Sequence, residues 1–205
     1  MQRTDPHPDQ KESAGSASDP NLEATTNSHD YQRCFIALVP DTATRDALSS
    51  IDIPTTARRV PYEQLHLTVT FIGVLPQEKA APLIESLTHE TVPLKRTPIT
   101  KIEHWPRASH PRLTVATLAM SDEFVALDWR VRSSMIALGL PVDARTFRPH
   151  VTLARYRQDA AAVGPAMDLQ HELIACFDSL TLYSSTLART GARYRSLASV
   201  PVVYG

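Results

Sequence analysis

Two stretches of the sequence spell the same short pattern: Leu65-His66-Leu67-Thr68-Val69-Thr70 and Pro149-His150-Val151-Thr152-Leu153-Ala154-Arg155. Both stretches are rich in β-branched and aliphatic residues, which predicts two β-strands. Successive side chains of a strand point to opposite faces, so each histidine shares a face with the threonine two residues later, while Leu67 or Val151 points into apolar packing. Each strand therefore offers one titratable ring beside one neutral hydroxyl.

The sequence around these strands predicts an α+β fold. We expect strands over residues 33–39, 65–72, 98–103 and 112–119, a strand after position 149, and more strands within 171–184 and 193–203. Apolar residues at three- and four-residue steps predict helices over 41–48, 77–90 and 121–138. The two histidines are 84 positions apart (150 minus 66), a spacing that lets them occupy equivalent places in two similar lobes built of mostly antiparallel sheets.

Composition and charge divide the chain into two parts. Residues 1–30 hold 2 basic and 6 acidic residues and almost no large apolar side chains, which predicts a disordered acidic extension. Residues 31–205 hold the other 19 basic and 16 acidic residues and are long enough for a single domain. This mildly basic body suits a small anionic group in a cleft and is too weakly charged for tight binding to a nucleic-acid duplex.

The chain contains two cysteines, too few for a disulfide framework or a cysteine-based zinc site. No apolar stretch follows the first charges, and no run of about 18 apolar residues occurs, so we expect neither secretion nor membrane insertion. The expectation is therefore a cytoplasmic protein without a membrane partner, and a monomer by default.

Two imidazoles and two hydroxyls suit one kind of chemistry. An imidazole has an ordinary pKa near 6.5, so one ring of a pair can activate water while the other protonates a leaving oxygen. The hydroxyls of Thr68 and Thr152 can hydrogen-bond the non-bridging oxygens of a phosphate. The sequence lacks a closely spaced set of metal ligands, a phosphate-binding glycine loop and a dinucleotide fingerprint, so we expect no metal and no cofactor.

Three segments of the chain carry a family resemblance: Arg33-Cys34-Phe35-Ile36-Ala37-Leu38, the run from Val60 to Gly73 around the first histidine, and Phe147-Arg148-Pro149 with the second histidine strand. On these residues, from about position 32 to its end, the chain resembles the two-histidine phosphoesterase superfamily. Within it, the chain is similar to the RNA 2′,3′-cyclic phosphodiesterases, once called 2′-5′ RNA ligases. The resemblance implies a bilobal, pseudo-symmetric α+β fold with two mostly antiparallel sheets, helices outside, and a central cleft with one H-x-T-x motif per lobe.

The same resemblance implies an activity and its residues. The family opens a nucleoside or RNA-terminal 2′,3′-cyclic phosphate to a 2′-phosphomonoester without a metal, and some members run the reverse joining reaction on tRNA halves. By motif position, His150 is the general base, His66 the general acid, Thr68 and Thr152 hold the phosphate, and Arg155 stands where the family has a phosphate-contacting arginine. The implied partners are RNA ends, such as tRNA fragments, or small cyclic nucleotides.

The position of Arg155 conflicts with the geometry of a regular strand. It lies five residues after His150, so strict alternation points it away from the histidine face, and the resemblance requires the strand to end or twist there. Arg157 and Arg148 have the right parity and are the alternatives.

Other aromatic and imidazole side chains are weaker candidates. Phe71 follows the first motif and could stack on a base, although an aromatic residue in a strand is more often part of the core. His104, Trp105 and His110 could rim the cleft, although a surface loop without a chemical role is the more common place for such residues, and we expect that here.

Two other functions stay open at this point. One is a related phosphodiesterase that acts on ADP-ribose 1″,2″-cyclic phosphate. The other is a nucleotide- or RNA-binding module that keeps the cleft without turnover.

Overall fold

The structure is a computed structural model that describes residues 31–164, 169, 171–188 and 191–205. The expected acidic extension over residues 1–30 lies outside this range. Most elements match the sequence prediction to within a few residues. In chain order they are β1 (Cys34–Pro40), α1 (Thr42–Ser50), β2 (Arg58–Arg59), β3 (Leu67–Gly73), α2 (Gln77–Glu90), β4 (Thr97–Trp105), β5 (Leu113–Leu118), α3 (Asp122–Ala137), β6 (His150–Arg155), β7 (Leu173–Ala175), β8 (Phe177–Ala188) and β9 (Gly191–Pro201).

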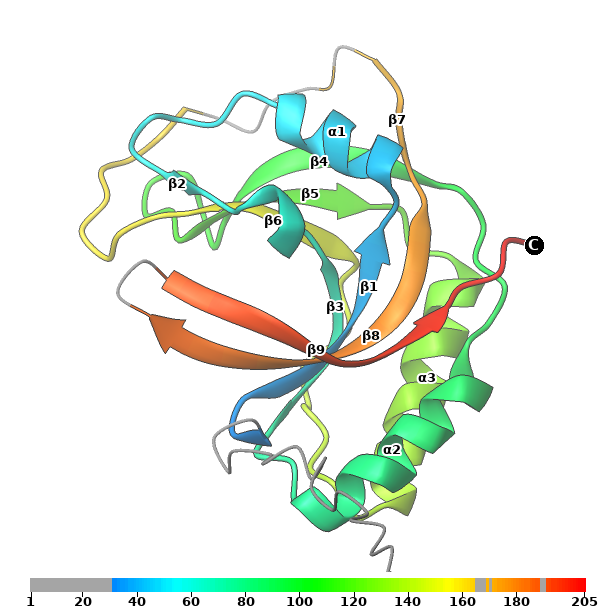
Figure 1. Ribbon diagram of the computed structural model, residues 1–205. Helices are drawn as coiled ribbons and strands as arrows, with labels where there is room; N and C mark the ends of the chain where they lie inside the picture. Colours follow the sequence, from blue (N-terminus) through cyan, green and yellow to red (C-terminus); the bar gives the residue numbers. More distant parts are fainter. Residues whose placement is uncertain (1–30, 165–168, 170, 189–190) are drawn as a thin grey trace, which may run out of the picture.

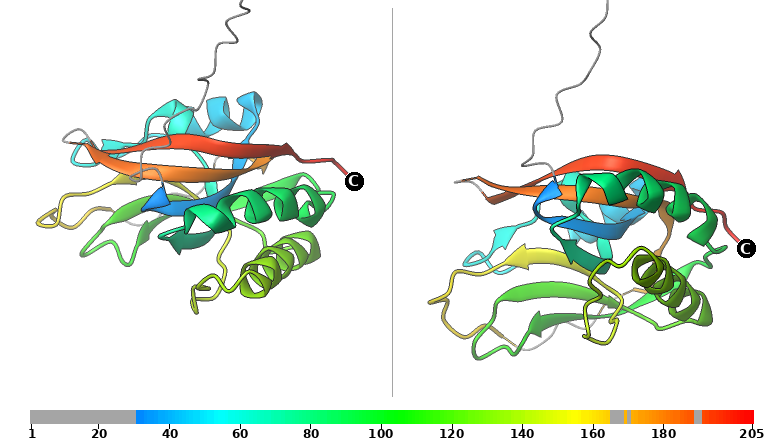
Figure 2. Two further views of the ribbon diagram at one scale, coloured as in Figure 1. Left: turned by 60° about the horizontal axis from the view of Figure 1, so that its bottom comes forward. Right: turned by 90° about the horizontal axis from the view of Figure 1, so that it is seen from below.

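Helices α1 and α3 begin where the sequence has capping residues, whereas α2 begins after Pro76 without a side-chain cap. The Asp41 carboxylate accepts a hydrogen bond from the Thr44 backbone N–H (2.7 Å) at the start of α1, and Ser121 does the same for Phe124 (3.3 Å) at the start of α3. Helices α2 and α3 lie side by side, as both views in Figure 2 show. Among the described residues, no helix combines the length and the apolar character needed to cross a membrane.

The strands form a mostly antiparallel sheet in the order β7-β4-β5-β6-β3-β1-β8-β9, with β2 added beside β6 (Figure 1). The α+β class and the antiparallel pairing are confirmed. The two expected sheets are nevertheless joined into one, because Leu67 of β3 pairs with Val151 of β6. Both side chains are fully buried, so pairing their backbones satisfies polar groups that water cannot reach. The two histidine motifs thus occupy the two central strands.

Strand β2 was not predicted, because its two residues lie in what the sequence indicates as a loop. Its backbone pairs with the end of β6, with Arg58 opposite Arg155 and Arg59 opposite Ala154. A two-residue strand is too short to show alternation, so the sequence carries no periodic signal for it. The pairing extends the sheet beyond the second histidine motif.

Candidate active site

The sheet register brings the two histidine motifs together. Leu67 and Val151 pair across β3 and β6 and point into the core, so their chain neighbours face the other side of the sheet. A cavity of about 1170 Å³ lies on that side. Its lining includes all five residues singled out from the sequence as site candidates: His66, Thr68, His150, Thr152 and Arg155. The structure thus unites them in one cavity, while their chemical roles stay a prediction.

Both imidazoles are anchored in the same way. Nδ1 of His66 lies 2.7 Å from the carbonyl oxygen of Gln64, and Nδ1 of His150 lies 2.7 Å from the carbonyl oxygen of Arg148. A carbonyl only accepts hydrogen bonds, so each Nδ1 carries the proton and donates it. The neutral rings therefore keep a lone pair on Nε2. Two equivalent nitrogens are left for a substrate, one from each half of the sheet.

His66 lies among aromatic rings. Its ring centroid is 5.1 Å from that of Phe35 and 5.2 Å from that of Tyr194, which meets it edge-on. This burial lowers the pKa of His66 to about 4, because the imidazolium loses its hydration. The hydrogen bond to Gln64 opposes the decrease, while the positive charges of Arg155 and His150 add to it. The ring is thus neutral at physiological pH.

His150 packs against Trp105, with ring centroids 4.5 Å apart. Two further contacts hold the Trp105 side chain in place. Its indole N–H donates to the Glu103 carboxylate (2.9 Å), and the Arg148 guanidinium lies 4.0 Å from its ring centroid. Burial lowers the pKa of His150, and the charges of Arg148 and Arg155 lower it further against the effect of the backbone hydrogen bond. The expectation that Trp105 lies on a surface loop without a role is wrong, because it ends β4 and touches a candidate catalytic ring.

The two threonines lie as the strand alternation predicts. Thr68 and Thr152 are half-buried on the cavity side, between fully or nearly fully buried neighbours in the core. Within the described part of the chain, neither hydroxyl is hydrogen-bonded to another protein group. Both are therefore available as donors to an oxyanion in the cavity.

A β-bulge explains how the Arg155 side chain reaches the same face of the sheet as His150. The β5–β6 ladder pairs Thr114 with Ala154 and Val115 with Thr152, so Leu153 is an extra residue in β6. The bulge reverses the alternation beyond it and turns Arg155 into the cavity with His150 and Thr152.

The two alternative arginines have other environments. Arg157 is exposed and paired with Asp159 at 3.3 Å, and Arg148 lies over Trp105 at the smaller neighbouring cavity. Strict alternation gave the wrong direction for the Arg155 side chain, because nothing in the sequence indicates a bulge at Leu153.

The first motif carries the matching bulge. The β1–β3 ladder pairs Ile36 with Thr70 and Ala37 with Thr68, which leaves Val69 as an extra residue three positions after His66. Phe71 consequently takes the place in β3 that the arginine holds in β6. It is 51% exposed and lines the cavity, so its assignment to the core is wrong. An exposed aromatic face is available there for stacking.

The other expected loop histidines lie elsewhere. His104 is part of β4 and is buried, with Nδ1 3.0 Å from the Thr114 hydroxyl, which is itself 3.0 Å from the Tyr156 hydroxyl. This network joins β4 and β5 to the residue that follows β6. His110 is exposed, with Nδ1 3.3 Å from the hydroxyl of its neighbour Ser109.

The sequence did not predict that positive charge would be concentrated around the cavity. Among the described residues its lining has no aspartate or glutamate. It has six arginines, from β2, β6, β9 and adjoining loops: Arg33, Arg58, Arg59, Arg145, Arg155 and Arg193. In the sequence, the adjacent pair Arg58-Arg59 is the one local indication that arginines gather there. The arrangement favours an anion. No group of three or more histidine, cysteine or carboxylate side chains in the described ranges is placed to hold a metal ion.

No family model matches the sequence, but curated proteins are similar to it. The RNA 2′,3′-cyclic phosphodiesterase of Geobacillus stearothermophilus is 27% identical over 165 residues, which cover 77% of this chain and 51% of that protein. The chain thus spans about half the length of this relative. The RNA 2′,3′-cyclic phosphodiesterase of Aeropyrum pernix is 26% identical over 162 residues, covering 76% of this chain and 91% of that protein.

Solved structures share the fold. A protein of Thermus thermophilus, TT0787, superposes with a TM-score of 0.69 at 24% identity, covering 84% of this chain and 98% of the other. E. coli LigT complexed with 3′-AMP gives 0.65 at 24% identity, covering 83% and 98%. The chain is therefore similar in sequence to curated RNA 2′,3′-cyclic phosphodiesterases and shares the fold of these solved structures.

Proposed function

We propose that the protein hydrolyses a 2′,3′-cyclic phosphate, on a nucleoside or at an RNA terminus, to a 2′-phosphomonoester. The observation that carries the proposal is the pair of imidazoles in one arginine-lined cavity, each held through Nδ1 with its Nε2 left for substrate. The curated relatives named RNA 2′,3′-cyclic phosphodiesterase support the same activity.

The two rings divide the proton transfers between them. His150 Nε2 removes a proton from water as its oxygen attacks phosphorus, and the protonated Nε2 of His66 gives its proton to the departing O3′. One P–O bond forms, the P–O3′ bond breaks, and the products are a 2′-phosphate and a 3′-hydroxyl. The hydroxyls of Thr68 and Thr152, with the Arg155 guanidinium, bind the non-bridging oxygens as negative charge grows on them. No step requires a metal ion.

The substrate itself supplies the condition that the acid needs. Burial favours the neutral form of both rings, and His66 with a pKa of about 4 is especially hard to protonate. A bound phosphate places negative charge beside the rings, which favours the imidazolium and raises its pKa. Binding therefore favours a protonated ring beside the phosphate, and the reactive form is the one in which His66 holds the proton and His150 is neutral. The reverse joining of a 2′-phosphate end to a 3′-hydroxyl would use the same groups with exchanged roles.

A product analysis tests this function. The protein is incubated with 2′,3′-cyclic AMP in the presence of EDTA, and the product isomer is identified by ³¹P NMR. We expect the 2′-phosphate at a rate that EDTA does not change. A 3′-phosphate product, or activity abolished by the chelator, contradicts the mechanism. Faster turnover of ADP-ribose 1″,2″-cyclic phosphate would favour the related phosphodiesterase, and binding without any turnover would favour the binding module.

A further inference from the structure

The carbonyl group that holds the His66 ring belongs to a short turn between β2 and β3. A single 3₁₀ turn covers Tyr62–Gln64, and its last residue supplies the carbonyl oxygen 2.7 Å from Nδ1 of His66. Backbone hydrogen bonds of 2.9 and 3.3 Å close the turn. One turn of this kind is too short to be stable by itself. The orientation of the imidazole therefore depends on what holds the turn in place.

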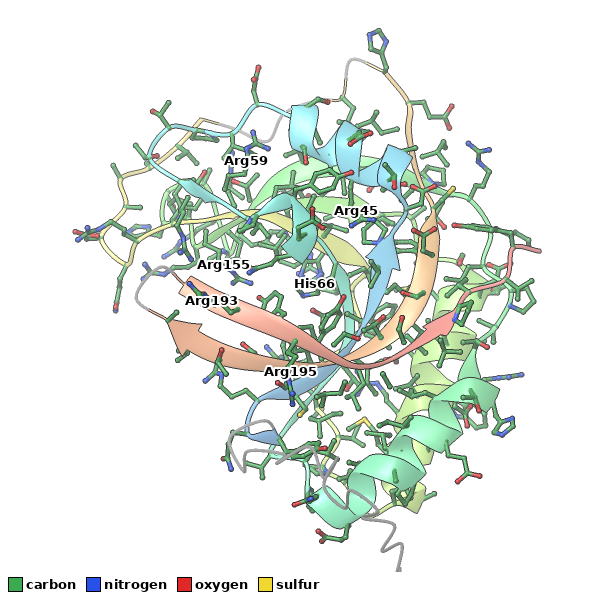
Figure 3. The ribbon with its side chains drawn as sticks, viewed as in Figure 1. Arg45, Arg59, His66, Arg155, Arg193 and Arg195 are labelled. Carbon is green, nitrogen blue, oxygen red and sulfur yellow. The ribbon has the colours of Figure 1, made fainter. Side chains whose placement is uncertain are left out.

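Helix α1 holds the turn through two consecutive residues. The Tyr62 hydroxyl donates to the Asp46 carboxylate (2.9 Å). The Arg45 guanidinium lies 5.2 Å from the Tyr62 ring centroid and 3.6 Å from the Glu63 carboxylate. In the view of Figure 3, Arg45 lies between α1 and His66. The helix thus contacts two consecutive residues of the turn.

Helix α1 is itself a fixed support. Leu48 is fully buried, and the Thr44 hydroxyl accepts a hydrogen bond from the Cys176 backbone N–H (2.9 Å) between β7 and β8. At the C-terminal end of the helix, Arg59 donates to two backbone carbonyl oxygens (3.1 and 2.6 Å). The segment that ends in the turn is therefore joined to α1 near both ends of the helix.

The second imidazole is anchored by a different kind of support. Its anchor is the Arg148 carbonyl, and the residues on either side, Phe147 and Pro149, are both buried. Gln64 is followed by the buried Leu65, but the two residues before it are half-buried and exposed. Core packing on both sides thus fixes one anchor, whereas the other depends on the polar contacts between the turn and α1.

The anchor decides which nitrogen of His66 carries the proton. While Nδ1–H donates to the Gln64 carbonyl, the neutral ring has its lone pair on Nε2, the nitrogen that must take up and deliver a proton. A ring released from the carbonyl exchanges between the two tautomers and turns more freely. The Nε2–H form of the neutral ring has no lone pair for the incoming proton at that position.

We propose that Tyr62 and Asp46 are positioning residues for His66. Their hydrogen bond holds the turn against α1 and thereby fixes the tautomer and the direction of the imidazole. This inference rests on the proposed function for the role of His66 as the acid. Tyr62 is not one of the described residues that line the cavity, so it acts through the Gln64 carbonyl.

The tautomer of His66 gives the direct test. The ¹⁵N chemical shifts of the ring nitrogens are measured at neutral pH, where a pKa of about 4 leaves the ring uncharged, and His66→Asn assigns the signals. We expect the Nδ1–H form in the unmodified protein and a mixture with the Nε2–H form in Tyr62→Phe. One hydrogen bond changes such an equilibrium by about fivefold. An unchanged tautomer in the variant would overturn the proposal.

Kinetics with 2′,3′-cyclic AMP add a second measurement. We expect Tyr62→Phe to lower kcat about fivefold, by the same hydrogen-bond contribution, with KM nearly unchanged because the groups that bind the phosphate remain. Asp46→Ala should have the same effect, and the double variant should lose no more than either single one. Asp46→Asn keeps an oxygen that accepts from Tyr62 and should restore most of kcat. Additive losses in the double variant would contradict a shared hydrogen bond.

Tyr204→Phe is the matched control. The Tyr204 hydroxyl donates to the Phe177 carbonyl (2.8 Å), and Tyr204 is not among the described residues that line the cavity. We expect this variant to lower Tm like Tyr62→Phe and to leave the tautomer of His66 and kcat unchanged. Equal losses of kcat in the two variants would reveal general destabilisation and overturn the positioning role. A tautomer shift in Tyr62→Phe, in a protein that hydrolyses no cyclic phosphate, would retain that role and refute the proposed function.

Discussion

At the scale of single residues, the proposed mechanism depends on the two imidazoles. Replacing His66 or His150 by asparagine removes a proton-transfer group while keeping a polar side chain of similar size. We expect each variant to lose about 10²-fold or more in kcat, the usual contribution of general acid–base catalysis. His110→Asn is the control, since His110 is exposed outside the cavity. Steady-state kinetics with 2′,3′-cyclic AMP, and a thermal melt to confirm folding, measure the effect; full activity in either variant would remove that ring from the mechanism.

Trp105 positions His150 without touching the reacting atoms. The indole is fixed between Glu103 and Arg148, and its ring limits the motion of the imidazole. We expect Trp105→Ala to lower kcat about tenfold, an order-of-magnitude loss typical of misplaced catalytic groups, and to move the pH profile toward the ordinary histidine pKa as solvent reaches the ring. Trp129→Ala is the matched control, because the other tryptophan of the chain is 68% exposed on α3. A loss of kcat without any shift of the pH profile would indicate a purely structural role.

At the scale of elements, the strands were predictable and their irregularities were not. Alternation correctly placed Leu67 and Val151 in the core and each threonine beside its histidine. The bulges at Val69 and Leu153 have ordinary aliphatic residues, so nothing in the sequence distinguishes them from regular strand positions. They nevertheless decide which side chains reach the cavity five residues after each histidine.

The bulge in β6 leads to a test between two arginines of one strand end. We expect Arg155→Gln to lower kcat/KM about 10- to 100-fold, because a hydrogen bond to a charged group contributes about 1.5–3 kcal/mol. Arg157→Gln should change it by less than about twofold, as an exposed ion pair contributes little. Measuring kcat/KM of both variants on the same substrate shows which arginine contributes to activity. The opposite ranking would mean that the strand keeps its regular alternation in solution.

At the scale of the whole molecule, the sheet brings segments that are distant in the sequence together around one arginine-lined cavity. The expected positive charge of the body was correct in sign, but its concentration on one cavity depends on β2 and β9, which meet β6 and the histidines only in the folded chain. Contacts of this kind, such as the pairing of Arg58 with Arg155, 97 positions further along the chain (155 minus 58), have no local sequence signal. The histidine pair could be found because its motif is repeated; the six arginines that line the cavity could not, because they come from separate segments of the chain.

The cavity environment also sets a pH dependence. The profile of kcat/KM reports the free protein, in which the pKa of His150 lies below 6.5 and that of His66 is about 4. Activity falls at low pH as the base ring gains its proton, and it falls at higher pH as the acid ring loses its proton. We therefore expect a kcat/KM optimum below pH 6.5. Bound phosphate raises both pKa values, so the kcat profile should lie at higher pH. Superimposable profiles of kcat and kcat/KM would contradict this coupling.

The central claim is that His66 and His150 act on a single phosphoryl group. An NMR titration of ¹³C-labelled histidine rings tests it most directly, with and without a saturating concentration of adenosine 2′-monophosphate, and with the two rings assigned through the His66→Asn and His150→Asn variants. The account predicts that the bound phosphate raises the pKa of both rings above their values in the free protein. A ligand that raises the pKa of one ring and leaves the other unchanged would contradict it.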